Sequence, residues 1–306
     1  METRKRKKAI PLREPNPLLV KELRGRVRST RAFVVLTVYL LLLSCLASLI
    51  YYVSGEGLRA SVGRSSTADI GRSVFSGIVL LQVLLVAFIT PGLTAGAISG
   101  EREQKTYELL RATLLPARKL VSGKLASALV YVILLILAAV PLESLAFMLG
   151  GVVVEELALA LVILLVTALA FGTVGLFFSS MVRRTRSSIV LTNAFALLVT
   201  FGLPVLALII AEGLLPIWAY GSASLISSAM EERIISTVYV LASFSPLAAP
   251  ILTSLALAEG SSIWITEITP YTSVPSAWII YAMAYLLLSL VLLLLTVRRL
   301  REQEVT

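Results

Sequence analysis

Residues 157–178 of the chain read LALALVILLVTALAFGTVGLFF, and none of these 22 positions holds a charged side chain. A helix needs about 20 apolar residues to cross the roughly 30 Å hydrocarbon layer of a bilayer. This stretch is therefore long enough and apolar enough to span a membrane. Five other runs have the same character, so the sequence predicts six transmembrane helices: 33–53, 74–98, 125–149, 157–178, 189–210 and 277–297.

The composition of the whole chain agrees with a membrane protein. Of its 306 residues, 58% are hydrophobic and 15% are charged. Soluble globular chains hold about 45–50% apolar and about 25% charged residues. A soluble protein of this size has no core large enough to bury so much apolar surface. We therefore predict an all-α integral membrane protein whose transmembrane domain covers residues 33–297.

The positions of lysine and arginine predict which ends of the spans face the cytoplasm. With both termini cytoplasmic, the inner side holds eleven basic residues before residue 33, six in 99–124, three in 183–186 and three in 298–301. The outer side then holds only Arg59, Arg64, Arg72 and Arg233. This bias predicts a multi-pass protein of the cytoplasmic (inner) membrane with both termini inside. It also explains the net charge of +9 by attraction to the anionic inner leaflet, without nucleic acid as a partner.

The first cytoplasmic part, residues 1–32, is a basic tail followed by an amphipathic stretch. Apolar side chains recur every four residues on one face of this stretch, and basic side chains line another face. The pattern predicts an elbow helix that lies in the plane of the membrane and contacts lipid. The elbow is either a plain lipid anchor or a lever that also leans on a cytosolic partner, and the residues favour neither. The residues that define it are Leu19, Leu23, Arg24, Val27 and Arg28.

The cytoplasmic loop 99–124 between the second and third spans combines apolar pairs with charges. Its apolar residues are Leu109, Leu110, Leu114 and Leu115, in a stretch that would otherwise be solvated. Exposed apolar residues rimmed by charge mark a docking surface. The other residues assigned to this surface are Glu101, Arg102, Glu103, Thr106, Glu108 and Arg111.

The segment 211–276 between the fifth and sixth spans is too long for a simple loop and too apolar for a disordered one. Its run 234–258 has the hydropathy of a span, but Pro246 and Pro250 interrupt it. We expect short re-entrant or surface-lying helices on the outer side, packed against protein. A pair of additional spans is the alternative. Residues 298–306 are expected to form a short cytoplasmic tail.

A few polar and small residues inside the predicted spans are candidates for function. Gln82, Glu143 and Asn193 either line a pathway or make interhelical hydrogen bonds worth around 1 kcal/mol. Gly92 and Gly96 lie four residues apart, a spacing that permits close approach of helices or subunits.

Several kinds of catalysis are excluded by what the sequence lacks. It has no histidine and one cysteine, Cys45, which excludes Ser-His-Asp and Cys-His catalysis and cysteine or imidazole metal clusters. A GxxxxGK[ST] phosphate loop is also absent, because Gly123-Lys124 is followed by Leu125, and Arg118 stands where the first glycine belongs. We predict that the chain is not an enzyme and binds no cofactor or metal.

Three stretches resemble the type-2 ABC transporter permeases, the membrane subunits of ABC exporters. Residues 91–103 (PGLTAGAISGERE), followed by Thr106 and Glu108-Leu109-Leu110, are similar to the region around that family's coupling helix. Residues 16–24 (NPLLVKELR) resemble the family's elbow, and 171–180 (FGTVGLFFSS) resemble its fourth span. The likeness covers nearly the whole chain in order and spacing, with 211–276 as the divergent part.

This resemblance implies how the chain would work. Two permease subunits, identical or different, would form a dimer around a translocation path, with cytosolic ATPase subunits docked below. The loop around 101–118 would be the coupling helix, and ATP and Mg²⁺ would bind to the partner. The expected function is export of an unidentified substrate. The alternative is an ion-coupled secondary transporter, which would need its own ion site near the middle of the bilayer.

Overall fold

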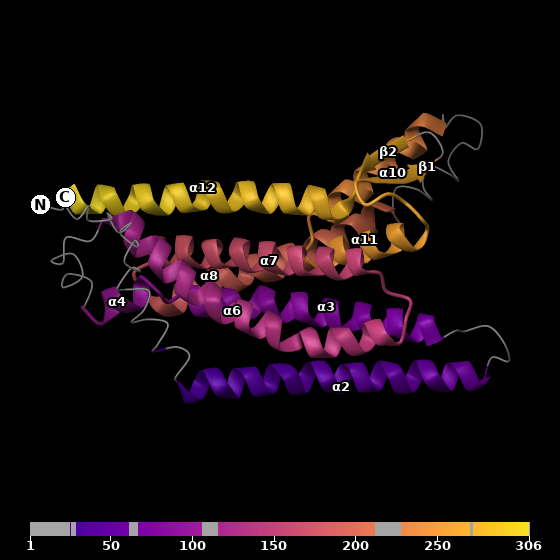
Figure 1. The fold of residues 1–306 in the computed structure, drawn as a ribbon. Helices are drawn as coiled ribbons and strands as arrows, with labels where there is room; N and C mark the ends of the chain where they lie inside the picture. Colours follow the sequence, from indigo (N-terminus) through magenta and orange to yellow (C-terminus); the bar gives the residue numbers. More distant parts are fainter. Residues whose placement is uncertain are drawn as a thin grey trace, which may run out of the picture.

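The computed structural model describes Gly25 and residues 29–60, 67–105, 116–211, 228–269 and 272–305. Within these ranges, six helices are long and apolar enough to cross a membrane (Figure 1). They coincide with the six predicted runs, which confirms the helical class and the number of span-length helices. Their bounds are α2 Thr30–Ala60, α3 Thr67–Thr94, α6 Ala117–Met148, α7 Val154–Met181, α8 Thr185–Leu197 with its continuation to Ala211, and α12 Ala277–Val305.

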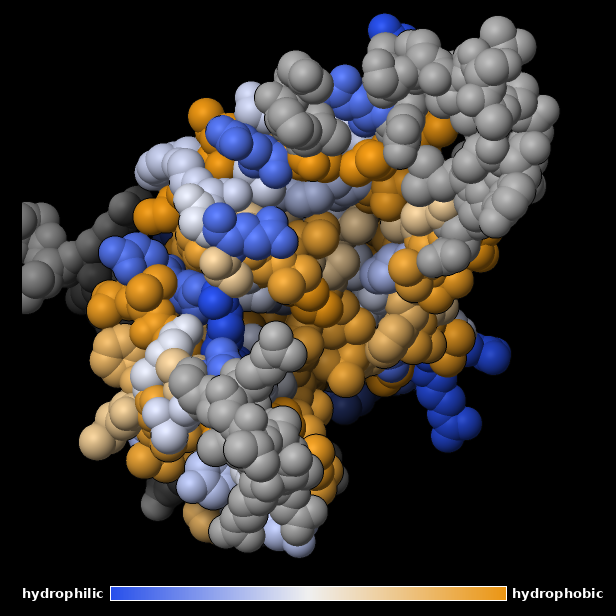
Figure 2. Space-filling model, turned by 90° about the vertical axis from the view of Figure 1, so that its right-hand side faces the viewer, coloured by the Kyte–Doolittle hydropathy of each residue, from blue (hydrophilic) through white to orange (hydrophobic). Residues whose placement is uncertain are grey.

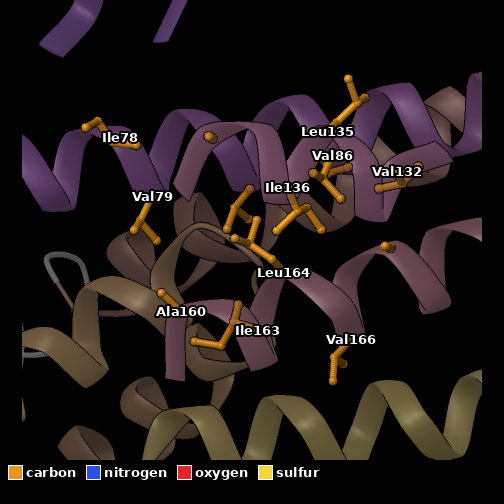
Figure 3. Packing of buried hydrophobic residues seen from close by; sticks show 14 of the residues in the cluster. Ile78, Val79, Val86, Val132, Leu135, Ile136, Ala160, Ile163, Leu164 and Val166 are labelled. Carbon is orange, nitrogen blue, oxygen red and sulfur yellow. The ribbon is translucent and has the colours of Figure 1, made fainter. Parts of the chain in front are cut away.

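Helix α7 is the centre of the bundle. It packs against α3 and α12, with α6 and α8 also beside it. Figure 3 shows Val86 of α3, Ile136 of α6 and Leu164 of α7 meeting in one buried cluster. Residues 157–178 of this helix carry no charge, and this part can be surrounded by other helices because it has no polar face that must reach water.

Helix α12 covers α7 with a set of aromatic contacts. The hydroxyls of Thr167 and Tyr281 lie 2.8 Å apart and share a hydrogen bond. The ring of Tyr285 stacks on Phe171 with 6.1 Å between the centroids, and its hydroxyl donates to the carbonyl of Phe244. These buried polar tips are all satisfied, so α12 holds α7 by both packing and hydrogen bonding.

Helix α2 is the most exposed of the six. It packs against α3 and α6 and buries Tyr39 and Leu43 there. Phe33, Leu41 and Tyr52 lie on its outer side and are more than half exposed. Such a surface is stable only in contact with lipid or with another apolar partner.

The two ends of the bundle differ in composition. At one end, here called the basic end, lie the start of α2, the short helix α4 (Ser99–Glu103), the turn between α7 and α8, and the end of α12. The described basic residues at this end are Arg102, Lys105, Arg118, Lys119, Lys124, Arg183, Arg184, Arg186, Arg298, Arg299 and Arg301. At the opposite end, the outer end, the described ones are Arg72 and Arg233. The antiparallel path of the helices thus sorts the charges as predicted, and the sidedness itself stays a prediction.

The outer end is formed by the segment between the fifth and sixth long helices. Two short helices, α10 (Ser228–Ser243) and α11 (Ala248–Ala258), are followed by the antiparallel strands β1 (Ile265–Thr269) and β2 (Thr272–Pro275). Both short helices pack against α12, and α11 also contacts α3 and α7. The described part of this segment therefore holds short packed helices and no further span. The hairpin was not predicted. Figure 2 looks onto this end, where hydrophilic patches alternate with exposed hydrophobic surface.

On α12, the distance from a tryptophan near one end to an arginine near the other matches the thickness of a bilayer. Trp278 lies in its first turn, where the indole N–H donates to the carbonyl of Ile263 at 2.8 Å and the ring packs on Trp264. Arg298 follows 20 residues later, a rise of about 30 Å in an α-helix. Tryptophan favours the membrane interface and arginine the cytoplasmic end. This spacing supports α12 as a span, and the side on which its arginines lie stays a prediction.

The fifth long helix contains a proline, and a serine between α10 and α11 replaces the hydrogen bond that this proline cannot donate. Pro204 has no N–H to give to the carbonyl of Thr200, and the turn Leu198–Gly202 is π-helical. The hydroxyl of Ser245 donates to this carbonyl at 3.0 Å and accepts the N–H of Leu247 at 3.2 Å. Ser245 therefore attaches the α10–α11 corner to the fifth span.

Replacing Ser245 with alanine should lower the thermal stability of the protein. The change leaves a buried carbonyl without its side-chain donor, which costs about 1–3 kcal/mol. For a chain of this size we expect the midpoint of thermal unfolding to fall by about 2–4 °C per kcal/mol, measured on purified protein in detergent. Ser236→Ala is the control, because that hydroxyl donates only within α10, to Arg233. Equal midpoints for the two variants would contradict the role of Ser245.

Candidate functional site

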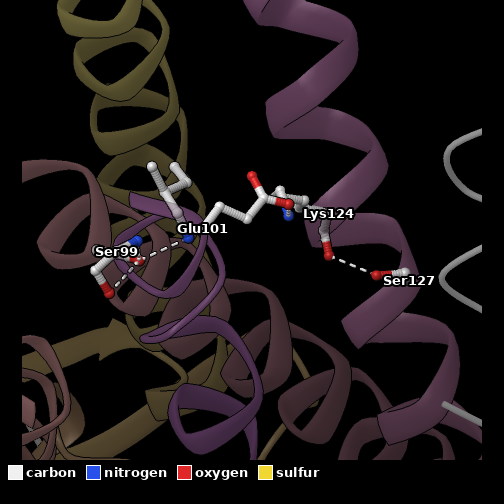
Figure 4. A network of polar contacts seen from close by, with 6 residues as sticks. Ser99, Glu101, Lys124 and Ser127 are labelled. Atoms are coloured by element: carbon white, nitrogen blue, oxygen red, sulfur yellow. Dashed lines mark hydrogen bonds and ion pairs between the residues drawn. The ribbon is translucent and has the colours of Figure 1, made fainter. Parts of the chain in front are cut away.

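The short helix α4 is tied to three long helices at the basic end, beginning with an ion pair to α6. The ammonium of Lys124 lies 2.6 Å from a carboxylate oxygen of Glu101 (Figure 4). Only 4% of the Lys124 side chain and 20% of the Glu101 side chain are exposed. Removing one partner of a pair this far from water is costly, because the other charge stays buried without compensation.

The second tie joins α4 to the end of α7. The hydroxyl oxygen of Ser179 accepts the backbone N–H groups of Ile98 and Ser99 at 2.9 and 3.0 Å. These are among the N–H groups at the start of a helix that have no partner within it. Arg102 adds a hydrogen bond from its guanidinium to the carbonyl of Ser180 at 3.2 Å.

The third tie joins α4 to the start of α8. The carboxylate of Glu103 accepts the hydroxyl of Thr185 at 2.6 Å and its backbone N–H at 3.2 Å. This places a negative charge at a helix N-terminus, where the helix dipole stabilises it. The two hydrogen bonds from Thr185 are the main reason that the pKa of Glu103 lies below its ordinary value.

Together these contacts form the α4 hub, defined by Ser99, Glu101, Arg102 and Glu103. The hub is continuous with α3 through residues 95–98 and is bonded to α6, α7 and α8. A displacement of the chain that follows Lys105 would therefore be passed to four of the six long helices.

The structure brings together part of the predicted docking loop. Glu101, Arg102 and Glu103 meet in the hub, and their partners Lys124, Ser179, Ser180 and Thr185 had not been predicted as contacts. The rest of the predicted loop surface lies outside the described residues: Thr106, Glu108, Leu109, Leu110, Arg111, Leu114 and Leu115. The predicted elbow residues Leu19, Leu23, Arg24, Val27 and Arg28 lie outside them as well.

A second polar cluster lies within the bundle, between α2, α3 and α6. Gln82 and Glu143 are fully buried, and Tyr39 is 1% exposed. The side chain of Gln82 approaches both the Tyr39 hydroxyl and the Glu143 carboxyl. No polar side-chain atom of the three has a hydrogen-bond partner among the described residues. Buried polar groups without partners are rare, which makes this cluster a candidate site for a proton, an ion or a water molecule.

The remaining candidates within the spans have different surroundings. A Cβ atom on Gly92 would meet nothing within 4 Å, so nothing described in the chain packs on this glycine. A Cβ atom on Gly96 would lie 3.1 Å from the Thr185 side chain, so Gly96 allows α8 to approach. Asn193 is half-buried in α8. Sequence reasoning identified Gln82 and Glu143 and missed Tyr39, because a tyrosine in an apolar run is also typical of a lipid-facing position.

Comparison with known proteins adds no relative to this picture. No protein-family model matches the chain, and no curated protein is significantly similar to it. The likeness to the type-2 ABC permeases therefore rests on the three stretches quoted above.

Proposed function

We propose that the chain is the permease subunit of an ABC exporter in the cytoplasmic membrane, driven by a separate ATPase subunit. The observation that supports this most is the α4 hub. It lies within residues 91–103, the stretch that most resembles the permease family, and it leads directly into the loop proposed to dock the ATPase.

The physical requirement for coupling is a stiff connection between the docking loop and the spans. A freely hinged loop would absorb the movement of a docked ATPase. The hub resists this, because an ion pair to α6, hydrogen bonds to α7 and a cap on α8 must all move with α4. The ATPase would bind ATP and Mg²⁺, and a second permease subunit, identical or different, would complete the path for a substrate still to be identified.

Replacing Leu109 and Leu110 with aspartate should abolish binding of the ATPase subunit. Two charges in an apolar contact must be desolvated on docking, which costs several kcal/mol. Membrane insertion should be unchanged, because both residues lie outside the predicted spans. The measurement is pull-down of the ATPase subunit by the tagged chain, together with ATP-driven transport in proteoliposomes.

The control for this test keeps the surface apolar. Leu109→Met with Leu110→Met changes shape but adds no charge, and it should retain capture and transport. Capture of the ATPase subunit by the aspartate variant at undiminished strength would contradict the proposed docking surface. Transport that survives mutation of the ATPase subunit's phosphate-loop lysine would contradict the function.

An ion-coupled secondary transporter is the second candidate, and the cluster of Tyr39, Gln82 and Glu143 favours it. A buried carboxyl among uncharged oxygen-bearing side chains is a typical place for a coupling proton or cation. The two functions are separated by the purified chain alone in liposomes. Solute movement driven by an ion gradient, and lost in Glu143→Gln, would support this alternative over the permease.

A further inference from the structure

A cavity of about 280 Å³ lies between α3, α7 and α11 toward the outer end of the bundle. Its walls are mainly apolar, with Phe75 and Val79 from α3, Leu159 and Ile163 from α7, and Ile251 and Leu255 from α11. Ile251 is 40% exposed and Leu255 is 54% exposed, so the α11 side forms an accessible rim. Small-molecule sites begin at about 300 Å³, which makes this cavity suitable for a small or slender molecule.

One acidic side chain lines this mainly apolar cavity, together with Ser76, Thr253 and Ser254. Glu156 is only 7% exposed, and one of its oxygens lies 2.7 Å from the guanidinium of Arg72. The same guanidinium nitrogen also donates to the carbonyl of Ser254 at 2.8 Å, so Arg72 joins α3 to both α7 and α11. The second carboxylate oxygen, Oε2, is buried and has no hydrogen-bond partner among the described residues.

A buried acceptor without a donor limits what the cavity can hold. Arg72 pairs with one oxygen of Glu156, and the vacant Oε2 requires a further hydrogen-bond donor, which a hydroxyl or a protonated amine supplies. A carboxylate or phosphate head group would be repelled there and would leave Oε2 unsatisfied. The mainly apolar walls favour a molecule whose remaining part is hydrocarbon.

We propose that this cavity binds a slender apolar molecule with one hydrogen-bond-donating head group, a hydroxyl or an amine, placed against Glu156. This inference goes beyond the proposed function and does not depend on it, because binding needs neither ATP nor a partner subunit. Access over the exposed rim of α11 lets such a molecule enter from the outer part of the bilayer.

The test uses the full chain in phosphatidylcholine nanodiscs with a diazirine-bearing octylamine as probe. After illumination, mass spectrometry locates the labelled peptides. We expect saturable labelling of the α3, α7 and α11 peptides that line the cavity. Unlabelled octylamine and octan-1-ol should displace the probe at concentrations about tenfold or more below the concentration of octanoate that is needed. A hydrogen bond to a charged group raises affinity by about this factor or more. The ratio of the displacing concentrations of octylamine and octan-1-ol shows which of the two head groups the cavity prefers.

Two pairs of variants distinguish the cavity from general partition into lipid. Glu156→Gln should weaken the binding of octylamine about tenfold, whereas Glu155→Gln, at an exposed neighbouring position, should leave it unchanged. Ala160→Phe should fill the cavity and abolish the labelling, whereas Ala158→Phe, on an exposed position of the same helix, should leave it. Labelling that is spread over all spans, survives Ala160→Phe, or is displaced equally by octanoate would overturn the proposal.

Discussion

Lys124→Met should cause the largest loss of stability of any single substitution among the residues that bind the α4 hub to the long helices. It leaves the Glu101 carboxylate in a largely buried site without the ammonium that lies 2.6 Å away. Removing one partner of a buried ion pair costs about 3–5 kcal/mol. We expect a fall of several degrees in the midpoint of thermal unfolding. Under the proposed function, we also expect loss of ATP-driven transport even when the protein is assayed at low temperature.

A double substitution separates the ion pair from the rest of the hub. Because an apolar replacement of both partners is often neutral or stabilising, Lys124→Met with Glu101→Leu should recover most of the lost stability. Arg118→Met is the matched control, since Arg118 lies on the same helix and is exposed. An Lys124→Met variant as stable as Arg118→Met, or a double variant less stable than Lys124→Met, would show that the pair does not stabilise the hub.

Three glycines on α3 should respond to alanine in a graded order, with Gly71 by far the most sensitive. A Cβ atom on Gly71 would overlap the backbone carbonyl of Gly150 and lie 3.0 Å from that of Ala146. Backbone atoms cannot rotate away, so α3 would have to separate from the end of α6. Overpacking of this kind costs about 1–3 kcal/mol and occasionally more, and we expect little folded protein by size-exclusion chromatography.

The other two glycines are the internal controls. A Cβ atom on Gly77 would overlap only the terminal methyl of Ile50, which can turn aside, and one on Gly92 would meet nothing within 4 Å. Alanine stabilises a helix by about 1 kcal/mol relative to glycine, so Gly92→Ala should match or exceed the parent protein in thermal stability. The midpoint of Gly77→Ala should lie between those of Gly71→Ala and Gly92→Ala. Equal midpoints for all three variants would contradict the close contact at Gly71.

The long apolar runs made the six main helices predictable, whereas their contacts were not. Hydropathy locates the part of a helix that lies in lipid, so it placed the end of the first span at residue 53, although α2 continues to Ala60. Glu103 contacts a residue 82 positions later in the chain. Spacing along one sequence carries no information about such a pair, so the docking loop was identified without its partners.

Two features were missed for more local reasons. The strands β1 and β2 lie in a segment whose apolar character suggested helices, although the β-branched isoleucines and threonines of 265–269 are a strand signal. Glu156 stands one position before the predicted span 157–178 and was not considered among the polar residues of the spans. Its importance follows from Arg72 and Ser254, which only the folded chain brings to it.

The position of α12 against α7 has a consequence for biosynthesis. The ribosome completes α7 at Met181 and begins α12 only at Ala277, after α8, α10, α11 and the hairpin have been made. In that interval the hydroxyl of Thr167 and the ring of Phe171 lack the tyrosines that cover them in the finished bundle. A nascent chain therefore exposes the face of its central helix to lipid and to membrane chaperones until α12 leaves the translocon, and insertion of α12 is the step that closes the bundle.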